Sequence, residues 1–350
     1  MHPFQYQRTE TADQAVAAVA QDPAGTFIAG GTSHVDLMKE GVLHPSLLVD
    51  VSGLPFKQIT AHEGGVRIGA GVSNTAAATS ADIRQRYPAV SEALLAGAST
   101  QIRNMASMGG NPLQRTRCPY FRDPTQACNK REPGSGCAAI GGYNHVHALF
   151  GASAACVATH PSDLAVALSA LDARVQTLGP DGPRTIAFPD LHRLPGDQPH
   201  RDTVLAHGEL ITSIDLPAFS GRSHYLKVRE RASYAYALVS CAVALEMNGS
   251  TIGRARVALG AVASKPWRVT AAEALLAGQV PTEPLFRAAA DAAFADARPL
   301  EHNAYKIPMG RNLMVRALLE TNGLQPLQGP AGTAFAASVG GVAGQFAVPR

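Results

Sequence analysis

AGGTSHVDLMKEG at residues 29–41 and QIRNMASMGGN at residues 101–111 each carry a Gly-Gly pair in an α/β context. Glycine permits positive φ and lets the backbone approach a ligand, so successive N–H groups can form a concave site for phosphate oxygens. Either loop alone is more often a plain turn. Two such loops, far apart in the chain, are explained more economically by one dinucleotide whose diphosphate is clamped from both sides.

The first loop belongs to a small α/β unit predicted at residues 1–55. The motif TADQ at residues 11–14 is a capping box, in which the threonine hydroxyl accepts an early backbone N–H and the glutamine reaches back. Two apolar runs, Thr26–Ala29 and Leu47–Val51, predict strands of one small sheet. The helix after the capping box is predicted from apolar residues at helical spacing, which are Ala15, Val16, Val19 and Ala20.

The second loop belongs to a larger α/β unit predicted at residues 56–220. A strand is predicted at Gly65–Gly69, and a loop rich in Gly, Pro and Cys at residues 112–156. Ser162–Leu171 begins with a favourable N-cap residue and is apolar on most faces, which predicts a buried helix. Residues 179–200 are rich in Pro, Gly and Asp, which predicts a loop.

The third unit, at residues 221–325, is predicted to be a sheet packed on helices, an α+β arrangement. Its predicted strands are His224–Arg231, Ala237–Glu246 and Thr251–Leu259, the last two joined by an Asn-Gly turn. Its predicted helices are Ala271–Leu276, Pro284–Ala295 and Met309–Glu320. The tail at residues 326–350 is rich in Gly and Ala without clear periodicity, so it is either disordered or ordered only against a partner.

Composition and charge argue against two classes of partner. A net charge of +3 over 350 residues is too small for a surface that neutralises many phosphates, which excludes nucleic acid. No apolar run reaches the ~18–20 residues of a membrane-spanning helix. The first residues lack the apolar core of a secretory signal. We therefore expect a cytoplasmic protein, or a periplasmic one co-exported with a signal-bearing partner.

Four of the five cysteines fall within one short stretch of the chain. Without an export signal, disulfides are not expected, and a metal or iron–sulfur site becomes the leading interpretation. Structural zinc is the rival, although zinc usually draws on closely paired ligands and this stretch has no C-x-x-C pair. Ordinary buried thiols are the third alternative, and the default for Cys241 in its apolar strand. The clustered cysteines are Cys118, Cys128, Cys137 and Cys156.

Five segments in order resemble the FAD-binding subunit of the xanthine dehydrogenase and molybdenum hydroxylase family. They are the two Gly-Gly segments together with HPSDLAVALSAL at 160–171, LAHGELITSIDLP at 205–217 and YLKVRERASYAYALVSCAVAL at 225–245. The resemblance covers about residues 1–320. It implies a two-part FAD-binding domain of vanillyl-alcohol-oxidase type, followed by a C-terminal α+β domain.

The resemblance also implies which residues hold FAD. Asp163 is expected to hydrogen-bond the ribityl chain or the ring, and Lys227 to lie near the pyrimidine edge of the flavin, where a cation stabilises the anionic reduced form. The alternatives are a carboxylate that complements a helix dipole and a solvated strand residue. The loop residues assigned to the cofactor are Ala29, Gly30, Gly31, Thr32, Ser33, His34, Gln101, Ile102, Gly109, Gly110 and Asn111. Ser33 and His34 stand where the family often has an acidic or amide residue, so the role of His34 stays open.

The cysteine-rich stretch resembles the extra [4Fe–4S] loop of 4-hydroxybenzoyl-CoA reductase and, more closely, of bacterial three-subunit aldehyde oxidoreductases. The resemblance implies that Cys118, Cys128, Cys137 and Cys156 are the cluster ligands, with Cys156 beyond the core of the loop. Basic residues crowd the same region, either as a solvated loop face or to compensate an anionic cluster and the FAD phosphates. They are Arg103, Arg115, Arg117, Arg122, Lys130 and Arg131.

These features together predict a subunit that breaks no bond in the organic substrate and carries no catalytic residue of its own. A partner with a molybdenum cofactor oxidises an aldehyde, and a [2Fe–2S] partner subunit passes the electrons to FAD and on to an external acceptor. Two other functions were weighed. One is a stand-alone FAD-dependent oxidase of the same fold, and the other is a non-catalytic, zinc-stabilised interaction module.

Overall fold

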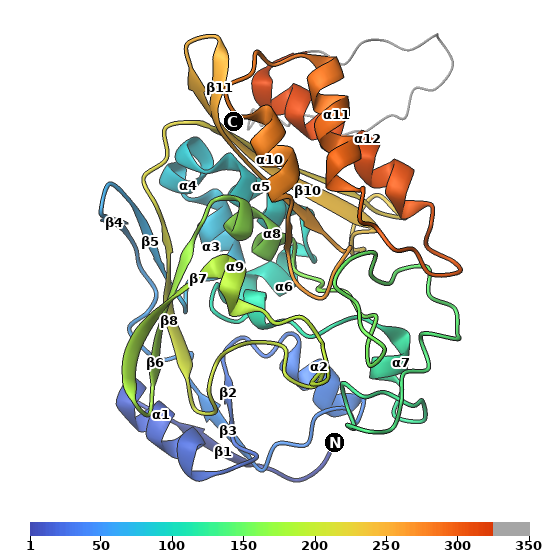
Figure 1. Ribbon diagram of the computed structural model, residues 1–350. Coiled ribbons are helices and arrows are strands. Elements are labelled where there is room, and N and C mark those ends of the chain that lie inside the picture. The colour runs from blue at the N-terminus through green and yellow to red at the C-terminus, as the bar shows by residue number, and fades with distance from the viewer. Residues whose placement is uncertain (325–350) are drawn as a thin grey trace, which may run out of the picture.

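The computed structural model describes residues 1–324, which form three sheets and the helices that cover them (Figure 1). The predicted tail at residues 326–350 lies outside the described residues. Each sheet is built from its own stretch of chain: residues 5–50, 59–216 and 222–268. Within the described part, no helix is both long and apolar enough to cross a bilayer.

The first sheet has three parallel strands in the order β1-β3-β2. Its elements are β1 (Gln5–Arg8), α1 (Ala12–Gln21), β2 (Thr26–Ile28), α2 (His34–Lys39) and β3 (Leu47–Asp50). The predicted strands and the helix after the capping box are present. Strand β1 was not predicted, because all four of its residues are exposed and show no apolar alternation. Helix α2 was also missed, and it begins inside the first glycine loop.

The capping box forms much as predicted. The Thr11 hydroxyl accepts a hydrogen bond from the backbone N–H of Gln14 at 3.2 Å, and the Gln14 side chain reaches back to the N–H of Glu10 at 3.2 Å. The buried stripe of α1 consists of Ala15, Val16 and Val19. Ala20 is exposed instead, so the stripe is one residue shorter than predicted.

The second sheet has five antiparallel strands in the order β4-β5-β8-β6-β7. The strands are β4 (Ile59–His62), β5 (Gly65–Gly69), β6 (Arg174–Gly179), β7 (Gly182–Ala187) and β8 (Leu210–Leu216). The helices are α3 (Asn74–Thr79), α4 (Ala81–Arg86), α5 (Pro88–Ala96), α6 (Thr100–Met105), α8 (Asp163–Ala170) and α9 (Phe188–Leu191). The strand predicted at Gly65–Gly69 is β5.

The loop predicted at residues 179–200 was wrong, because β7 and α9 lie within it. Gly179 and Gly182 face each other at the tip of the β6–β7 hairpin. Pro183 follows in β7, which is the edge strand of the sheet. A proline costs an edge strand little, since its missing N–H is on the unpaired side or at the strand end. Glycine and proline therefore mark a hairpin and its edge, although their composition reads as loop.

Helix α8 is the buried centre of the molecule, as predicted. All eight of its residues are buried, and the Ser162 hydroxyl caps it by accepting the backbone N–H of Ala165 at 3.0 Å. It packs against α5 on one side and against β10 and β11 of the third sheet on the other. Its first residue, Asp163, therefore lies where the second unit of the chain packs against the third sheet.

The third sheet has four antiparallel strands in the order β12-β11-β10-β9. The strands are β9 (Arg222–Val228), β10 (Val239–Asn248), β11 (Thr251–Gly260) and β12 (Trp267–Arg268). The helices are α10 (Thr270–Leu276), α11 (Glu283–Ala293) and α12 (Lys306–Asn322), which cover one side of the sheet in Figure 1. All three predicted strands and helices are present, and Gly249 has the positive φ that the Asn-Gly turn requires.

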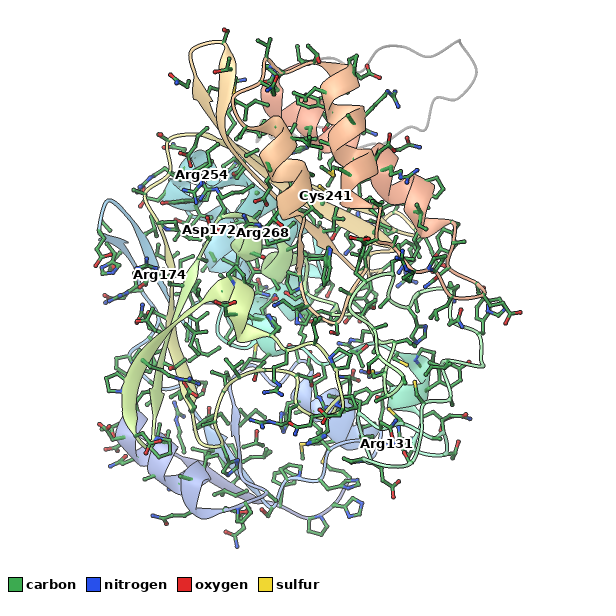
Figure 2. The ribbon with its side chains drawn as sticks, viewed as in Figure 1. Arg131, Asp172, Arg174, Cys241, Arg254 and Arg268 are labelled. Atoms are coloured by element: carbon green, nitrogen blue, oxygen red, sulfur yellow. The ribbon has the colours of Figure 1, made fainter. Side chains whose placement is uncertain are left out.

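Ion pairs connect the end of α8 to the third sheet. The carboxylate of Asp172, just after α8, accepts hydrogen bonds from Arg268 at 2.5 Å, Arg254 at 2.9 Å and Arg256 at 3.1 Å (Figure 2). These arginines lie on β11 and β12. The thiol of Cys241 is fully buried in β10, in the apolar core that the third sheet shares with its helices.

Residues 112–156 contain little regular structure. The 3-10 turn at Asn111–Leu113 opens this stretch, and α7 (Pro119–Arg122) is its one α-helix. The rest is irregular backbone along one flank of the molecule, where Figure 1 shows α7. The predicted Gly-, Pro- and Cys-rich loop is thus present as a loop, and it carries all four clustered cysteines.

Candidate cofactor-binding site

A cavity of about 980 Å³ runs between the first glycine loop, the second glycine loop and the third sheet. This volume lies at the upper end of the usual range for small-molecule sites, about 300–1,000 Å³. Eleven of the thirteen residues predicted to hold a cofactor line it. They are Ala29, Gly30, Gly31, Thr32, Ser33, His34, Ile102, Gly110, Asn111, Asp163 and Lys227. Gln101 is exposed and Gly109 is buried behind the loop, so neither reaches the cavity.

The two glycine loops touch each other directly. A Cβ atom at Gly30 would overlap the carbonyl oxygen of Met105, at the end of α6, so only glycine allows this approach. Gly31 has φ +68°, a conformation that other residues rarely adopt. Among the described residues, no acceptor is found for the backbone N–H groups of Gly31, Thr32 and Ser33. The first loop therefore offers a run of unpaired donors beside the cavity.

The second loop is fixed by backbone hydrogen bonds to the segment after β5. The N–H of Met108 bonds the carbonyl of Val72 at 2.9 Å, and the N–H of Gly109 bonds that of Ala70 at 2.9 Å. A Cβ at Gly109 would lie 2.7 Å from the Cβ of Ala70. Gly109 is therefore needed for packing, which explains why it matches the family motif and yet does not face the cavity.

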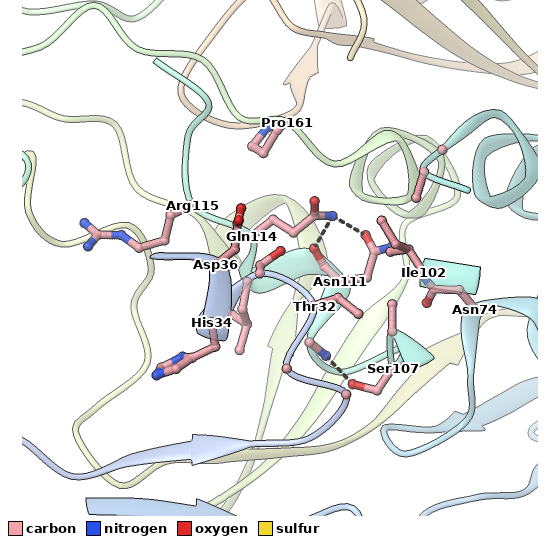
Figure 3. A pocket seen from close by; sticks show the side chains of 18 of the residues that line it. Thr32, His34, Asp36, Asn74, Ile102, Ser107, Asn111, Gln114, Arg115 and Pro161 are labelled. Atoms are coloured by element: carbon pink, nitrogen blue, oxygen red, sulfur yellow. Dashed lines mark hydrogen bonds between the residues drawn. The ribbon is translucent and has the colours of Figure 1, made fainter. Parts of the chain in front are cut away.

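Polar side chains finish the second loop (Figure 3). The Ser107 hydroxyl accepts a hydrogen bond from the backbone N–H of Gly110 at 3.1 Å. The side-chain oxygen of Asn111, Oδ1, accepts a hydrogen bond from the Ser162 hydroxyl at 2.6 Å. Gln114 donates to the same Asn111 oxygen at 3.1 Å. Asn111 thus joins the loop to the N-cap residue of α8.

Three buried polar atoms of residues that line this cavity have no partner among the described residues. They are Nε2 of His34, Oδ1 of Asn74 and Nε of Arg117. Burial lowers the pKa of His34, so the imidazole is neutral at pH 7. Buried polar groups are nearly always hydrogen-bonded, so each of these atoms is a candidate for a hydrogen bond to a ligand. Asn74 was not predicted, because a lone asparagine after a serine cap has no distinguishing pattern.

Asp163 and Lys227 form an ion pair at the inner end of the cavity. The Lys227 ammonium lies 2.7 Å from the carboxylate, and the exposed fractions of the two side chains are 4% and 7%. Tyr225 donates its hydroxyl to the same carboxylate at 2.6 Å, and Lys227 also donates to the carbonyl of Ala96 at 3.2 Å. Sequence reasoning assigned separate roles to the two charges and missed their pairing.

The four clustered cysteines converge on a second, small pocket. Cys118, Cys128 and Cys156 are buried and Cys137 is half-buried, and all four are free thiols that line this pocket. Cys128 and Cys137 face each other across an isolated antiparallel bridge. Burial raises the pKa of Cys118 to about 12, so this thiol ionises at neutral pH only beside a positive charge such as a metal.

Two nitrogen atoms lie within hydrogen-bonding distance of sulfur atoms in this pocket, one in the backbone and one in a histidine ring whose role depends on its tautomer. The backbone N–H of Ala158 lies 3.5 Å from Sγ of Cys156, and Nε2 of His147 lies 3.1 Å from Sγ of Cys118. In residues 1–324, no three His, Cys, Asp or Glu side chains are placed so that they could hold one metal ion. The single-ion zinc alternative therefore gains no support, and the [4Fe–4S] assignment stays a prediction.

The basic residues near the cysteines are mostly engaged by the protein itself. Asp36 accepts from Arg117 at 3.1 Å and from Arg122 at 2.5 Å. Asp202 accepts from Arg115 at 2.7 Å and from Lys130 at 2.5 Å. Arg131 and Arg103 donate to backbone carbonyls. Arg103, Arg115 and Arg117 also line the 980 Å³ cavity, and Lys130 lines the cysteine pocket, so the charge-compensation role stays a prediction.

Comparison with known families places the chain among flavoproteins. Residues 2–219 match the FAD binding domain in molybdopterin dehydrogenase, and residues 224–321 match the CO dehydrogenase flavoprotein C-terminal domain. The chain belongs to the FAD-binding subunits of the molybdenum hydroxylase family. The predicted fold class, a two-part FAD-binding domain followed by a C-terminal α+β domain, is thereby confirmed.

This FAD-binding subunit is similar over most of its length to several characterised proteins. It is 47% identical to the aldehyde oxidoreductase FAD-binding subunit PaoB of Escherichia coli K12, over 91% of this chain and 98% of that one. It is 26% identical to a chain of carbon monoxide dehydrogenase from Hydrogenophaga pseudoflava, with a TM-score of 0.73 over 92% of this chain and 99% of that one. Quinoline 2-oxidoreductase from Pseudomonas putida 86 shares the fold, with a TM-score of 0.72 at 22% identity over 92% of this chain and 98% of that one.

Proposed function

We propose that this subunit binds FAD in the 980 Å³ cavity and passes electrons within a molybdenum-dependent aldehyde oxidoreductase. The observation that carries the proposal is the contact between Gly30 and the backbone before the second glycine loop, beside a cavity that ends at the Asp163–Lys227 pair. Two loops that touch can share one diphosphate. A charged pair at the far end of the same cavity gives the flavin ring a polar anchor.

The residues fit FAD in charge and in hydrogen-bonding capacity. The unpaired N–H groups of residues 31–33 supply anion-binding donors, as backbone nests do for phosphate. Asn74 and His34 supply buried atoms that lack partners. Lys227 supplies a cation that favours an anionic reduced ring. When bound, the flavin accepts and releases electrons one or two at a time.

The cysteine pocket is assigned to a [4Fe–4S] cluster on the chemistry of its donors. Four cysteine thiols are the ligand set that such clusters use. The backbone N–H of Ala158 and Nε2 of His147 lie near two of their sulfur atoms. A single ion would need all ligand atoms about 2.0–2.3 Å from one point. A cubane binds each thiolate at a different iron, so its ligands stand farther apart.

Aldehyde is proposed as the substrate of the complex because this chain is 47% identical to PaoB, an aldehyde oxidoreductase subunit. The partners proposed are a molybdenum-cofactor subunit, where substrate chemistry takes place, and a [2Fe–2S] subunit that delivers electrons. An external acceptor then takes the electrons from FAD.

Composition of the anaerobically purified complex tests this proposal. We expect flavin absorbance, one FAD released per copy of this subunit, and iron and acid-labile sulfide in excess of the partner's [2Fe–2S] clusters. Gly30→Ala should lose FAD, because its Cβ would separate the two loops. Gly141→Ala is the matched control, since a Cβ there meets nothing within 4 Å. Full FAD retention in Gly30→Ala would contradict the proposed site.

A further inference from the structure

His147 is a buried histidine that the proposed function leaves unused. Its side chain is 1% exposed, and its Nε2 atom lies 3.1 Å from Sγ of Cys118. Its other ring nitrogen, Nδ1, is also buried and has no partner among the described residues. A histidine with one nitrogen aimed at a cysteine sulfur and the other left unpaired is not explained by ordinary core packing, which favours satisfied polar atoms.

The backbone of His147 is fixed by the C-terminal domain. Its carbonyl accepts a hydrogen bond from Nζ of Lys306 at 3.0 Å and from Nδ2 of Asn303 at 3.1 Å. Both of these side chains are fully buried, and Lys306 also holds the carbonyls of Val146 and Ala261, at 3.0 and 2.7 Å. Burial of Lys306 among these three carbonyls lowers its pKa to about 7, because a buried ammonium is costly. These hydrogen bonds hold the backbone of residues 146–147 against the C-terminal domain.

We propose that His147 is a positioning residue that donates Nε2–H to the sulfur of Cys118 and thereby raises the reduction potential of the iron–sulfur cluster. This inference rests on the proposed function. A cysteine bound to iron carries no proton, so in that pair only the imidazole can donate. Hydrogen bonds to cluster sulfurs stabilise the reduced, more negative cluster, which is a recognised way for a protein to set its potential.

The His147–Cys118 contact borders a cavity that also adjoins the proposed FAD site. A third cavity of about 410 Å³ lies between the two sites, and both Cys118 and His147 line it. Its wall also includes Asp163, which lines the FAD cavity as well. Among the residues lining this cavity in the described chain, Cys118 is the one member of the cysteine set. Of the four clustered cysteines, Cys118 is therefore the one that borders a cavity shared with the proposed FAD site.

An EPR-monitored redox titration of the intact complex tests the inference, with the [4Fe–4S] signal separated from [2Fe–2S] signals by its faster relaxation. His147→Phe should shift the midpoint potential of the cluster downward, because the ring keeps its volume and loses its donor. His147→Gln should restore most of the potential, since its amide N–H reaches a similar position. His145→Phe is the matched control, because His145 stacks on Tyr143 and contacts no cysteine; it should leave the potential unchanged.

The outcomes separate this inference from the proposed function. A wild-type complex without the extra iron and sulfide overturns both. A cluster whose potential is the same in wild type, His147→Phe and His147→Gln overturns the inference alone. Should His147→Phe fail to assemble, pulsed EPR of the wild-type complex with ¹⁵N-histidine decides. A weak nitrogen coupling supports a hydrogen bond to sulfur, whereas no coupling, or one as strong as that of an iron-bound nitrogen, overturns it.

Discussion

At the scale of single residues, the site depends on pairs that lie far apart in the sequence. Gly30, Gly31 and Gly110 line the cavity as the sequence predicted, whereas Gly109 packs against Ala70, and their contact with a phosphate stays a prediction. The Asp163–Lys227 pair could not be predicted, because it joins α8 to β9, which are far apart in the sequence. The His147–Cys118 contact could not be predicted either, because both residues lie in an irregular loop without a periodic pattern. Asn74 carried no signal in the sequence at all.

Breaking the Asp163–Lys227 pair should be expensive, because both side chains are more than nine-tenths buried. Lys227→Met leaves an uncompensated carboxylate, which typically costs about 3–5 kcal/mol of folding free energy. Chemical denaturation of the purified chain measures this loss. Adding Asp163→Asn to Lys227→Met should recover part of it, since the lone charge is then removed. Arg311→Met, which loses only an exposed pair with Asp291, should change stability by at most about 1 kcal/mol. Additive losses in the double variant would contradict the pairing.

At the scale of elements, prediction succeeded where a local signal and burial agree. Helix α8 begins after a serine whose hydroxyl caps it, and its sequence shows both this cap and the apolar faces. Helix α11 begins after a threonine that caps it in the same way. Prediction failed for β7, whose Gly and Pro residues serve a hairpin at the edge of a sheet, and for β1, whose residues are all exposed. An edge strand is defined by its neighbour, so its own residues need carry no apolar pattern.

A histidine with two carboxylate partners, here called the histidine clamp, joins β9, α5 and α12. It should make the stability of the subunit depend on pH. His224 on β9 contacts Glu92 on α5 at 2.8 Å and Glu320 on α12 at 2.9 Å. Burial alone would lower the pKa of His224, but the two carboxylates outweigh it and raise the pKa above 6.5. Around the clamp, Arg316 pairs with Glu320 and the N–H of Tyr225 donates to Glu92.

The sign of the effect follows from the raised pKa. The clamp contributes its full stability below the unfolded pKa of about 6.5, where His is protonated in both states. That contribution is lost as pH rises through the folded pKa. His224→Gln should therefore be less stable than wild type at pH 6, and the difference should shrink towards pH 9. Denaturation curves of both proteins across this range measure it. A difference that stays constant with pH would mean that the imidazole is not charged in the clamp.

At the scale of the whole molecule, the chain keeps two proposed cofactor sites apart, and a third cavity shares lining residues with each of them. The FAD cavity has no cysteine among its lining residues in the described chain, and the cysteine pocket has no residue of either glycine loop. Asp163 and Cys118 nevertheless border the same intermediate cavity. The order of the family motifs could be read from the sequence, whereas this spatial relation between the sites could not. The compartment of the protein stays a prediction.

Separate sites predict separate loading. Cys128→Ser should abolish the cluster and leave FAD bound, because the substitution removes one of four sulfurs and touches no wall of the FAD cavity. Iron, sulfide and released flavin, measured on the same anaerobic preparation of the complex, report the two cofactors independently. Cys241→Ser is the control: this thiol is fully buried in β10, away from the pocket, so the variant should lose some stability and keep both cofactors. If Cys128→Ser retained its iron, that cysteine would not be a ligand. If it lost FAD together with the iron, the cysteine loop would have to shape the flavin site as well, and the two sites could no longer be treated as independent.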